Sequence, residues 1–266
     1  MSVAISASLV KDLRDQTGAG MMDCKRALEE TGGDVEAARR LLRERGMASA
    51  AKRADRETTE GLVGYRIADT HGTMVAVGCE TEPVSKNEEF QAFAKRVLEL
   101  VDADGVEALE QLEQERQELI AKLSENISVA GAARFEKVDG GVLGAYVHPP
   151  ANKLGVLVQL RGASEDLARK LAMHIAWSAP QWISRDDVPE DVASAERDIY
   201  LNSDEVQSKP EQAREKIVEG MLGKRFFAVQ VLLDQPWIHD QAKTVAQALS
   251  DDGAEVLELE RFSLAG

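Results

Sequence analysis

The pentapeptide Gly61-Leu62-Val63-Gly64-Tyr65 has a counterpart later in the chain, Gly141-Val142-Leu143-Gly144-Ala145. Turn residues and a second apolar run follow each copy, at 74–77 and at 156–160. In both halves the next segment has apolar residues at helical spacing. Because an internal repeat constrains the architecture, the sequence predicts an α+β core built from two strand–strand–helix units.

Three short helices are predicted before the repeat. Ser6 or Ser8 is a candidate N-cap for the first and Asp34 for the third. Glycine-containing turns separate the helices, and Gly46 suits the C-terminal end of the last one. We therefore predict a three-helix docking module over residues 1–54, with a linker or loose helix over 48–59.

The second half of the repeat contains an insertion. Residues 183–225 read as two antiparallel helices joined near Ser208-Lys209-Pro210, sparse enough in apolar side chains to form a protruding arm. A strand is predicted at 227–232, then a helix near Val245 and a last strand at 256–259. The predicted division is thus 1–54 for the module, 55–140 for the first core half, 141–182 with 226–266 for the second, and 183–225 for the arm.

Composition limits which classes of protein the chain can belong to. The 266 residues carry a formal charge of −15, with 47 acidic and 32 basic side chains. The best basic cluster, at 39–45, alternates with glutamate and reads as a solvated helix face, so direct nucleic-acid binding is not expected. No apolar run reaches membrane-spanning length, and residues 1–5 lack the pattern of a secretory signal. Two cysteines far apart favour a reducing cytoplasm.

A search for catalytic chemistry returns little. There is no phosphate-binding loop, no nucleophile elbow and no pair of metal-spaced His or Cys residues. His71 and His174 are expected to be structural or exposed. Cys79 is either a nucleophile or, more commonly for such a residue, a small buried apolar side chain. We expect no catalytic residue, metal or cofactor, and so an interaction protein; an enzyme with an unrecognised site is the rival.

Three stretches carry a resemblance to a known family. Residues 9–28 read LVKDLRDQTGAGMMDCKRAL and closely resemble the N-terminal module of elongation factor Ts, which has a fold like ubiquitin-associated domains. Residues 79–87 read CETEPVSKN and resemble the family's core motif, in which Asp-Phe usually stands where this chain has Glu82-Pro83. Segments 155–158, 172–176 and 216–220 are similar to second-half motifs, so the resemblance covers nearly the whole chain.

The resemblance implies a cytoplasmic guanine-nucleotide exchange factor, which helps elongation factor Tu release GDP during translation elongation. In the family, the aromatic residue of the core motif wedges into the GTPase domain and disturbs its Mg²⁺ and phosphate contacts. The positions that match contacts to the GTPase domain are Arg14, Met21, Met22, Thr81, Glu82, Pro83, Val84, Leu123 and Ser124. Those that match contacts to another domain of elongation factor Tu are His148, Pro236, Trp237 and Ile238.

Several of these positions have a second interpretation. One of Met21 and Met22 is expected in the core of the bundle, because a short helix buries a single face. Trp237 either anchors an interface or caps the core, and Glu82 is either a contact or an ordinary surface charge. The 183–225 arm either pairs with a second copy of the chain or stays monomeric.

Pro83 is the main departure from the family pattern. Proline shortens and stiffens the wedge and is expected to bias Glu82 toward an extended conformation. Exchange is then weaker, or the partner carries a matching change, or Val84 and the backbone displace the nucleotide contacts. The rival within the family is a binding adaptor or chaperone of elongation factor Tu with weak or no exchange.

Overall fold

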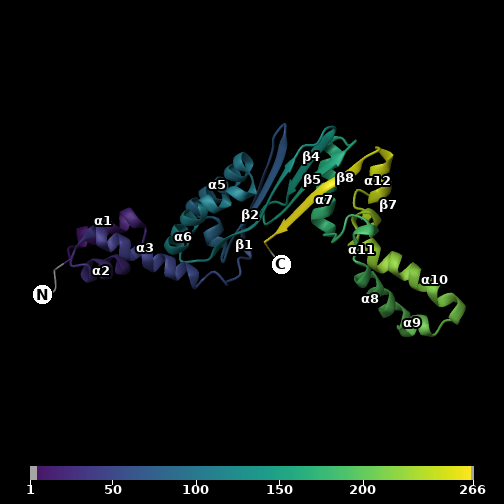
Figure 1. Cartoon of the computed structure of the whole chain (residues 1–266), viewed down its shortest axis with the longest axis horizontal. Coiled ribbons are helices and arrows are strands. Elements are labelled where there is room, and N and C mark those ends of the chain that lie inside the picture. Colours follow the sequence, from purple (N-terminus) through teal and green to yellow (C-terminus); the bar gives the residue numbers. More distant parts are fainter. Residues whose placement is uncertain (1–4, 265–266) are drawn as a thin grey trace.

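The computed structural model describes residues 5–264. The first four residues of the predicted module, with most of the stretch tested for a signal, and the last two residues of the chain lie outside that range. The fold is α+β. A helical bundle stands at one end, two sheets with flanking helices form the middle, and a helical arm projects from the other end (Figure 1).

The N-terminal bundle consists of α1 (Ala7–Thr17), α2 (Met21–Glu30) and α3 (Val35–Ala51). The Ser6 hydroxyl accepts from Leu9 N at 3.2 Å and the Asp34 carboxylate from Ala37 N at 3.0 Å, so both predicted N-caps form. Gly18, at φ 68°, ends α1 in the left-handed region. The buried side chains are Val10, Leu13, Cys24, Ala27, Leu28 and Ala38.

The predicted end of the third helix at Gly46 is wrong, because α3 continues to Ala51. A Cβ at Gly46 would stand only 2.8 Å from the Cβ of Ala121 in α6 (Glu113–Leu123). The glycine therefore permits a close helix crossing rather than a cap. Ala50, one turn later, is buried in the core. The first part of the predicted linker is thus helix that packs the bundle onto the core.

Two antiparallel three-stranded sheets form the centre. The first contains β1 (Glu60–Ile67), β2 (His71–Cys79) and β3 (Ile127–Glu136), in that order. The second contains β4 (Gly141–Val147), β5 (Leu154–Arg161) and β8 (Glu255–Ser263). The predicted repeat is confirmed by β1–β2 and β4–β5, and each unit gains a third strand.

The two sheets pack face to face between helices. On β2, Met74 and Ala76 face the other sheet, whereas Val75 and Val77 face α5 (Glu88–Asp104). On β5, Leu157 faces the first sheet and its neighbours face α7 (Glu165–Ser178). This alternation has the period of two that a strand imposes. It gives four layers, helix–sheet–sheet–helix, in which β2 and β5 are buried on both faces.

The third strand of the first sheet, β3, was not predicted. Its middle residues 130–133 are all Ala or Gly, which lack the β-branched signal of a strand. A Cβ at Gly131 would stand 2.6 Å from the ring of Phe262 on β8. Small residues are needed at this position because the two sheets approach closely here.

The predicted strand at 227–232 is wrong. The arm contains η2 (Arg185–Asp187), α8 (Glu190–Leu201), α9 (Asp204–Gln207) and α10 (Glu211–Met221). The last helix continues through a π-helical segment, η3 (Leu222–Phe227), into α11 (Ala228–Gln230) and η4 (Leu232–Asp234). Leu222 and Phe226, four residues apart, share the arm's own apolar cluster with Val231. The spacing of these apolar side chains is therefore helical, although the residue types favour a strand.

The remaining elements connect these layers. The predicted last helix and strand are confirmed by α12 and β8. The other elements include a one-turn helix after β2 and a short hairpin before α12. The bounds are α4 (Glu82–Ser85), η1 (Val106–Leu112), β6 (Pro236–Trp237), β7 (Asp240–Thr244) and α12 (Val245–Asp251).

The duplicated pentapeptide supplies a matched pair of mutations. A Cβ at Gly144 would meet Ala168 of α7 at 2.6–2.7 Å, whereas one at Gly64 would meet only Leu98, at an ordinary 3.5 Å. We expect Gly144→Ala to lower the free energy of unfolding by about 1–3 kcal/mol through overpacking. Gly64→Ala should change it by less than about 1 kcal/mol. Urea unfolding followed by circular dichroism measures both, and equal losses would refute the close approach of α7.

Candidate partner-binding surface

The turn between α1 and α2 presents an exposed face. Met21 and Met22 are 54% and 62% exposed, and Arg14 is also exposed. The expectation that one methionine lies in the bundle core is wrong. The Cys24 thiol, which shares a stripe with Met21, is covered instead by the preceding turn, where it lies 3.7 Å from the carbonyl oxygen of Ala19. Both methionines are left outside, where flexible side chains suit an adaptable contact.

The core motif forms a second exposed turn directly after β2. Thr81 is the extended N-cap of α4, and Thr81, Glu82 and Pro83 are exposed, whereas Val84 packs partly against the core. The expected extended conformation of Glu82 is wrong, since this residue begins the helix. Proline is tolerated in the first turn, where its missing N–H is not needed. The Ser85 hydroxyl, 2.7 Å from the Glu82 carbonyl oxygen, helps to hold the turn.

The end of α6 adjoins both turns. Ser124 caps this helix in the left-handed region at φ 61° and is exposed, while Leu123 packs partly into the core. The Lys122 side chain runs beside Gly18, where a Cβ would stand 2.5 Å from it. The structure therefore brings the N-terminal turn beside the 123–124 turn.

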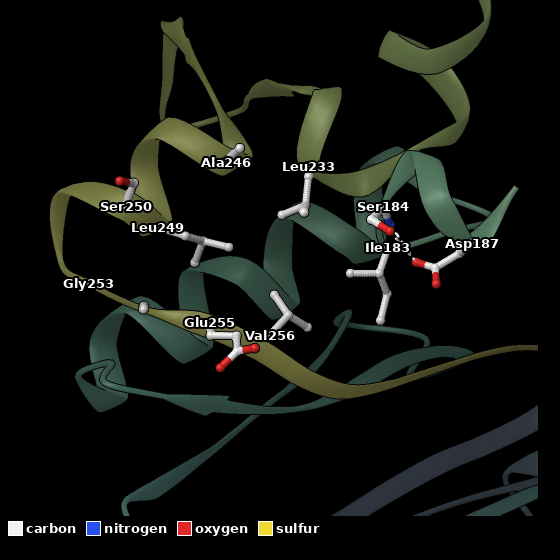
Figure 2. A pocket seen from close by; sticks show the side chains of 11 residues that line it. Ile183, Ser184, Asp187, Leu233, Ala246, Leu249, Ser250, Gly253, Glu255 and Val256 are labelled. Atoms are coloured by element: carbon white, nitrogen blue, oxygen red, sulfur yellow. Dashed lines mark hydrogen bonds between the residues drawn. The ribbon is translucent and has the colours of Figure 1, made fainter.

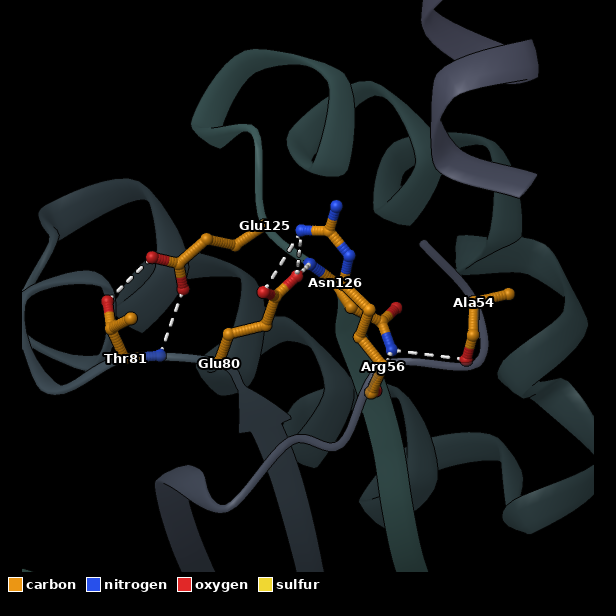
Figure 3. A network of polar contacts seen from close by, with 6 residues as sticks. All are labelled: Ala54, Arg56, Glu80, Thr81, Glu125 and Asn126. Carbon is orange, nitrogen blue, oxygen red and sulfur yellow. Dashed lines mark hydrogen bonds and ion pairs between the residues drawn. The ribbon is translucent and has the colours of Figure 1, made fainter. Parts of the chain in front are cut away.

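Polar contacts tie the 123–124 turn to the core motif (Figure 3). The Glu125 carboxylate accepts from the hydroxyl of Thr81 at 2.6 Å and from its N–H at 3.0 Å. The Glu80 carboxylate accepts from Asn126 N at 2.6 Å and pairs with Arg56 at 3.2 Å. Of these side chains the sequence singled out only Thr81, because glutamates are abundant throughout the chain. Their one visible signal was the position of Glu80 inside the motif.

The four residues predicted to meet another domain belong to the second core half, away from the N-terminal turn (Figure 1). His148 and Pro236 are exposed, and Ile238 is half-buried. Trp237 is only 5% exposed and stacks on the ring of His174 at 5.1 Å between centroids. Of the two interpretations of Trp237, its burial matches the one in which the indole caps the core.

Trp177, at the end of α7, is 82% exposed. The side-chain amide of Gln235 donates to the carbonyl oxygens of Ser178, next to Trp177, at 3.4 Å and of Val229 at 2.6 Å. These bonds connect the end of α7 to α11, which continues the last helix of the arm. Val229 is 52% exposed. An exposed aromatic thus stands near Pro236, and sequence reasoning missed it. Its available signal was a tryptophan at a position of α7 outside the apolar stripe.

An open groove lies where the arm meets the core (Figure 2). It encloses about 570 Å³, and its apolar lining includes Ile183, Leu233, Leu249 and Val256. The polar groups at its rim already have partners: the Asp187 carboxylate accepts from Ser184 N at 2.7 Å, and Glu255 pairs with Arg161. The groove marks the junction of arm and core and gathers no reactive groups.

Catalytic groups do not converge within residues 5–264. No cluster of three His, Cys, Asp or Glu side chains in that range could hold a metal ion. Burial, with a smaller effect of the Glu125 charge, raises the pKa of the Cys79 thiol to about 12. The thiol is therefore protonated near neutral pH, which disfavours it as a nucleophile. No helix in the described range is both long and apolar enough to cross a bilayer.

Comparison with known proteins identifies the family. A family model described as elongation factor TS matches residues 80–266. The chain is 41% identical to elongation factor Ts of Enterobacter sp. (strain 638), over 98% of this chain and 91% of that protein. It is 42% identical to elongation factor Ts of Teredinibacter turnerae (strain ATCC 39867 / T7901), with the same coverage.

The chain belongs to the elongation factor Ts family. Identity of 41% to elongation factor Ts of Pasteurella multocida (strain Pm70), over 98% of this chain and 92% of that one, agrees. The relatives also cover the N-terminal bundle, which the family model does not reach. Membership places the chain among the elongation factors of protein biosynthesis, in the exchange-factor class.

In this family member, His174 joins α7 to the segment that follows the arm. Ile238 N donates to its Nδ1 at 3.3 Å, so Nε2 carries the proton and donates to the Gln235 side-chain oxygen at 2.9 Å. Burial lowers the pKa of His174 below its ordinary value. A second proton would have to sit on Nδ1, facing the N–H of Ile238, so the folded state requires the neutral ring. Its structural interpretation is confirmed.

His174 should therefore make stability depend on pH. As pH falls below about 6.5, the unfolded chain binds a proton that the folded chain refuses, so the free energy of unfolding decreases. We expect His174→Gln to cost about 1–3 kcal/mol at pH 7.5 and to flatten this decrease between pH 7.5 and 5.5. Urea unfolding at several pH values measures it. His148→Gln, at an exposed histidine, is the control; a wild-type slope in His174→Gln would refute the assignment.

Proposed function

We propose that this protein is a guanine-nucleotide exchange factor that binds elongation factor Tu and promotes GDP release by disturbing the Mg²⁺ and phosphate site of the GTPase. The observation that carries the proposal is that the turns at 18–22, 81–83 and 123–124, far apart in sequence, are neighbours in the fold. Lys122 lies beside Gly18 and Glu125 binds Thr81, and the exposed residues are 20–22, 81–83 and 124. Met21, Met22 and Pro83 supply the exposed apolar side chains, and Arg14 adds a charge.

Thermodynamic linkage explains how such a surface would act. A protein that binds the nucleotide-free GTPase more tightly than the GDP form must weaken GDP binding by the same factor. The 81–84 turn would enter the GTPase domain, beside contacts from Arg14, Met21, Met22, Leu123 and Ser124. His148, Pro236 and Ile238 would contact another domain. Trp237 would support that second contact from behind, since its ring is buried.

The proposal extends to the organisation of the chain. The division is that of the sequence analysis: a ubiquitin-associated-like module at 1–54, core halves at 55–140 and at 141–182 with 226–266, and an arm at 183–225. The protein would work in the cytoplasm and would be a binding protein rather than an enzyme. It would have no cofactor and no direct contact with nucleic acid or membrane.

Release of fluorescent GDP from elongation factor Tu of the same organism tests the exchange function. We expect saturating protein to lower the GTPase's affinity for GDP by about 10- to 100-fold, within the usual range of coupling, and to speed release in a stopped-flow instrument. Pro83→Phe should speed it further, because the ring reaches beyond proline. Pro210→Phe, at an exposed proline of the arm, is the control.

The alternative within the family is an adaptor or chaperone of elongation factor Tu with weak or no exchange, which the loss of the aromatic at Pro83 favours. It predicts a stable complex with an unchanged rate of GDP release for the natural sequence. Acceleration by Pro83→Phe alone would then place the defect at this side chain. Absence of any complex would reject both functions.

The arm offers a surface for a second copy of the chain. Ile199 of α8 is 61% exposed, although the arm has its own apolar cluster. We propose pairing through this face, and sedimentation equilibrium tests it: Ile199→Glu should halve the average mass. Glu196→Gln, one turn earlier, is the control. A monomeric wild type would show that the arm stays unpaired.

A further inference from the structure

Backbone pairing between β2 and β3 ends at Cys79 and Ile127. In a continuing antiparallel ladder, the next N–H groups would bond to carbonyl oxygens of the opposite strand. Here a side chain takes over: Asn126 N donates to the carboxylate of Glu80 at 2.6 Å, across the gap between the strands. A hydrogen bond from an N–H to a carboxylate is stronger than one to a neutral oxygen.

The opposite strand does the same in return. Thr81 N donates to the Glu125 carboxylate at 3.0 Å, and its hydroxyl donates at 2.6 Å (Figure 3). Each strand thus contributes one glutamate and one N–H to the other. We call this arrangement the reciprocal clamp, formed by Glu80, Thr81, Glu125 and Asn126.

Each of the two carboxylates of the clamp accepts hydrogen bonds from a different additional donor. Arg56 pairs with both oxygens of Glu80, at 3.2 and 3.3 Å, and the Thr81 hydroxyl serves Glu125. A carboxylate accepts at both oxygens, whereas a glutamine side chain has one acceptor oxygen and an amino group that cannot accept. At position 125 a glutamine could keep both contacts to Thr81, because its oxygen can accept from Thr81 N while its amino group donates to the threonine hydroxyl. An alanine has no side-chain acceptor, so Glu125→Ala would remove both bonds between Glu125 and Thr81.

The clamp stands in for the missing cap of α4. An N-cap threonine ordinarily accepts from the N–H of the second or third helical residue. The second helical residue here is Pro83, which has no N–H, and the Thr81 side chain makes no cap bond to its own helix. The hydroxyl donates to Glu125 instead. The orientation of the exposed turn therefore depends on a residue of another segment, directly after Ser124.

A third segment meets the clamp at Asn126. The Asn126 side-chain amide donates to the carbonyl oxygens of Ala54 at 3.2 Å and Arg56 at 2.7 Å, and the residue is almost fully buried. These carbonyls belong to the chain that leaves α3. The N-terminal bundle, the 81–84 turn and the 123–124 turn are thereby joined at one point.

We infer that Glu80 and Glu125 are positioning residues of the exchange surface. They fix the 81–84 turn relative to the 123–124 turn and the N-terminal bundle before the partner arrives, so that binding energy is not consumed in ordering them. This inference rests on the proposed exchange function. The bundle and the second core half still dock when the clamp opens, whereas the turn no longer reaches the nucleotide site in the correct orientation.

The test combines two measurements on Glu125→Ala. In the protein alone, NMR hydrogen exchange should show the Thr81 amide exchanging about tenfold faster or more, as expected for loss of one charge-assisted bond. With elongation factor Tu, the maximal rate of GDP release should fall about tenfold. The concentration at half-maximal rate should change less than threefold. Glu107→Ala, the same change at an exposed glutamate, should match the wild type in both.

A double-mutant cycle with Thr81→Val should show no further loss of the maximal rate in the Glu125→Ala background, because the hydroxyl contact is already absent there. A faster Thr81 amide with wild-type GDP release would overturn the positioning role. So would a rise in the half-maximal concentration at an unchanged maximal rate, since Glu125 would then be a mere contact. If the wild type fails to accelerate GDP release, the exchange function and the positioning role are both rejected. The hydrogen-exchange measurement needs no partner, so it still shows whether Glu125 holds the Thr81 amide in place.

Discussion

Close approach of the two sheets is the constraint on which the remaining structure depends. At Gly155 of β5, an added Cβ would stand 2.5 Å from Val63 of the first sheet, and at Gly131 of β3 it would meet Phe262 at 2.6 Å. Larger side chains at these points would separate the sheets and expose the layer between them, which contains Met74 and Leu157. With both inner faces occupied by the opposite sheet, helices can cover only the outer faces. The bundle and arm consequently lie beyond the sandwich.

This arrangement places the residues of the proposed partner-binding turn at a strand end. Because β2 is buried on both faces, the first residues free of the core are those just after Cys79, where the exposed turn begins. The close crossing of α3 and α6 at Gly46 and Ala121 then carries the N-terminal bundle to the same edge. A rigid core and a continuous helix thus set the spacing of contacts that are far apart in sequence, with no long flexible connection between them.

Sequence reasoning succeeded where side chains alternate or repeat. The paired strands β1–β2 and β4–β5, with α5 and α7, follow from period and duplication. It failed where tertiary contacts override local preference. Strand β3 is built from small residues that the facing sheet requires, and residues 227–230, predicted as part of a strand, are helical because they continue the last helix of the arm. Gly46 was read as a cap because a glycine's close contact cannot be seen along the chain. The partners of Glu80 and Glu125 are equally invisible, since they depend on where two strands diverge.

The structure also limits how the core motif could act with Pro83 in place of the family's usual aromatic residue. Val84 packs partly into the core, so only part of its side chain is available to a partner. Glu82 is exposed and pairs with Lys86 at 2.7 Å, which lowers the pKa of its carboxyl group and keeps it charged. The freely presented part of the motif is therefore a rigid pyrrolidine ring flanked by a carboxylate. As the proposed wedge, this part of the motif would have little apolar reach, and its action would depend on where the turn is held rather than on how far its side chains extend.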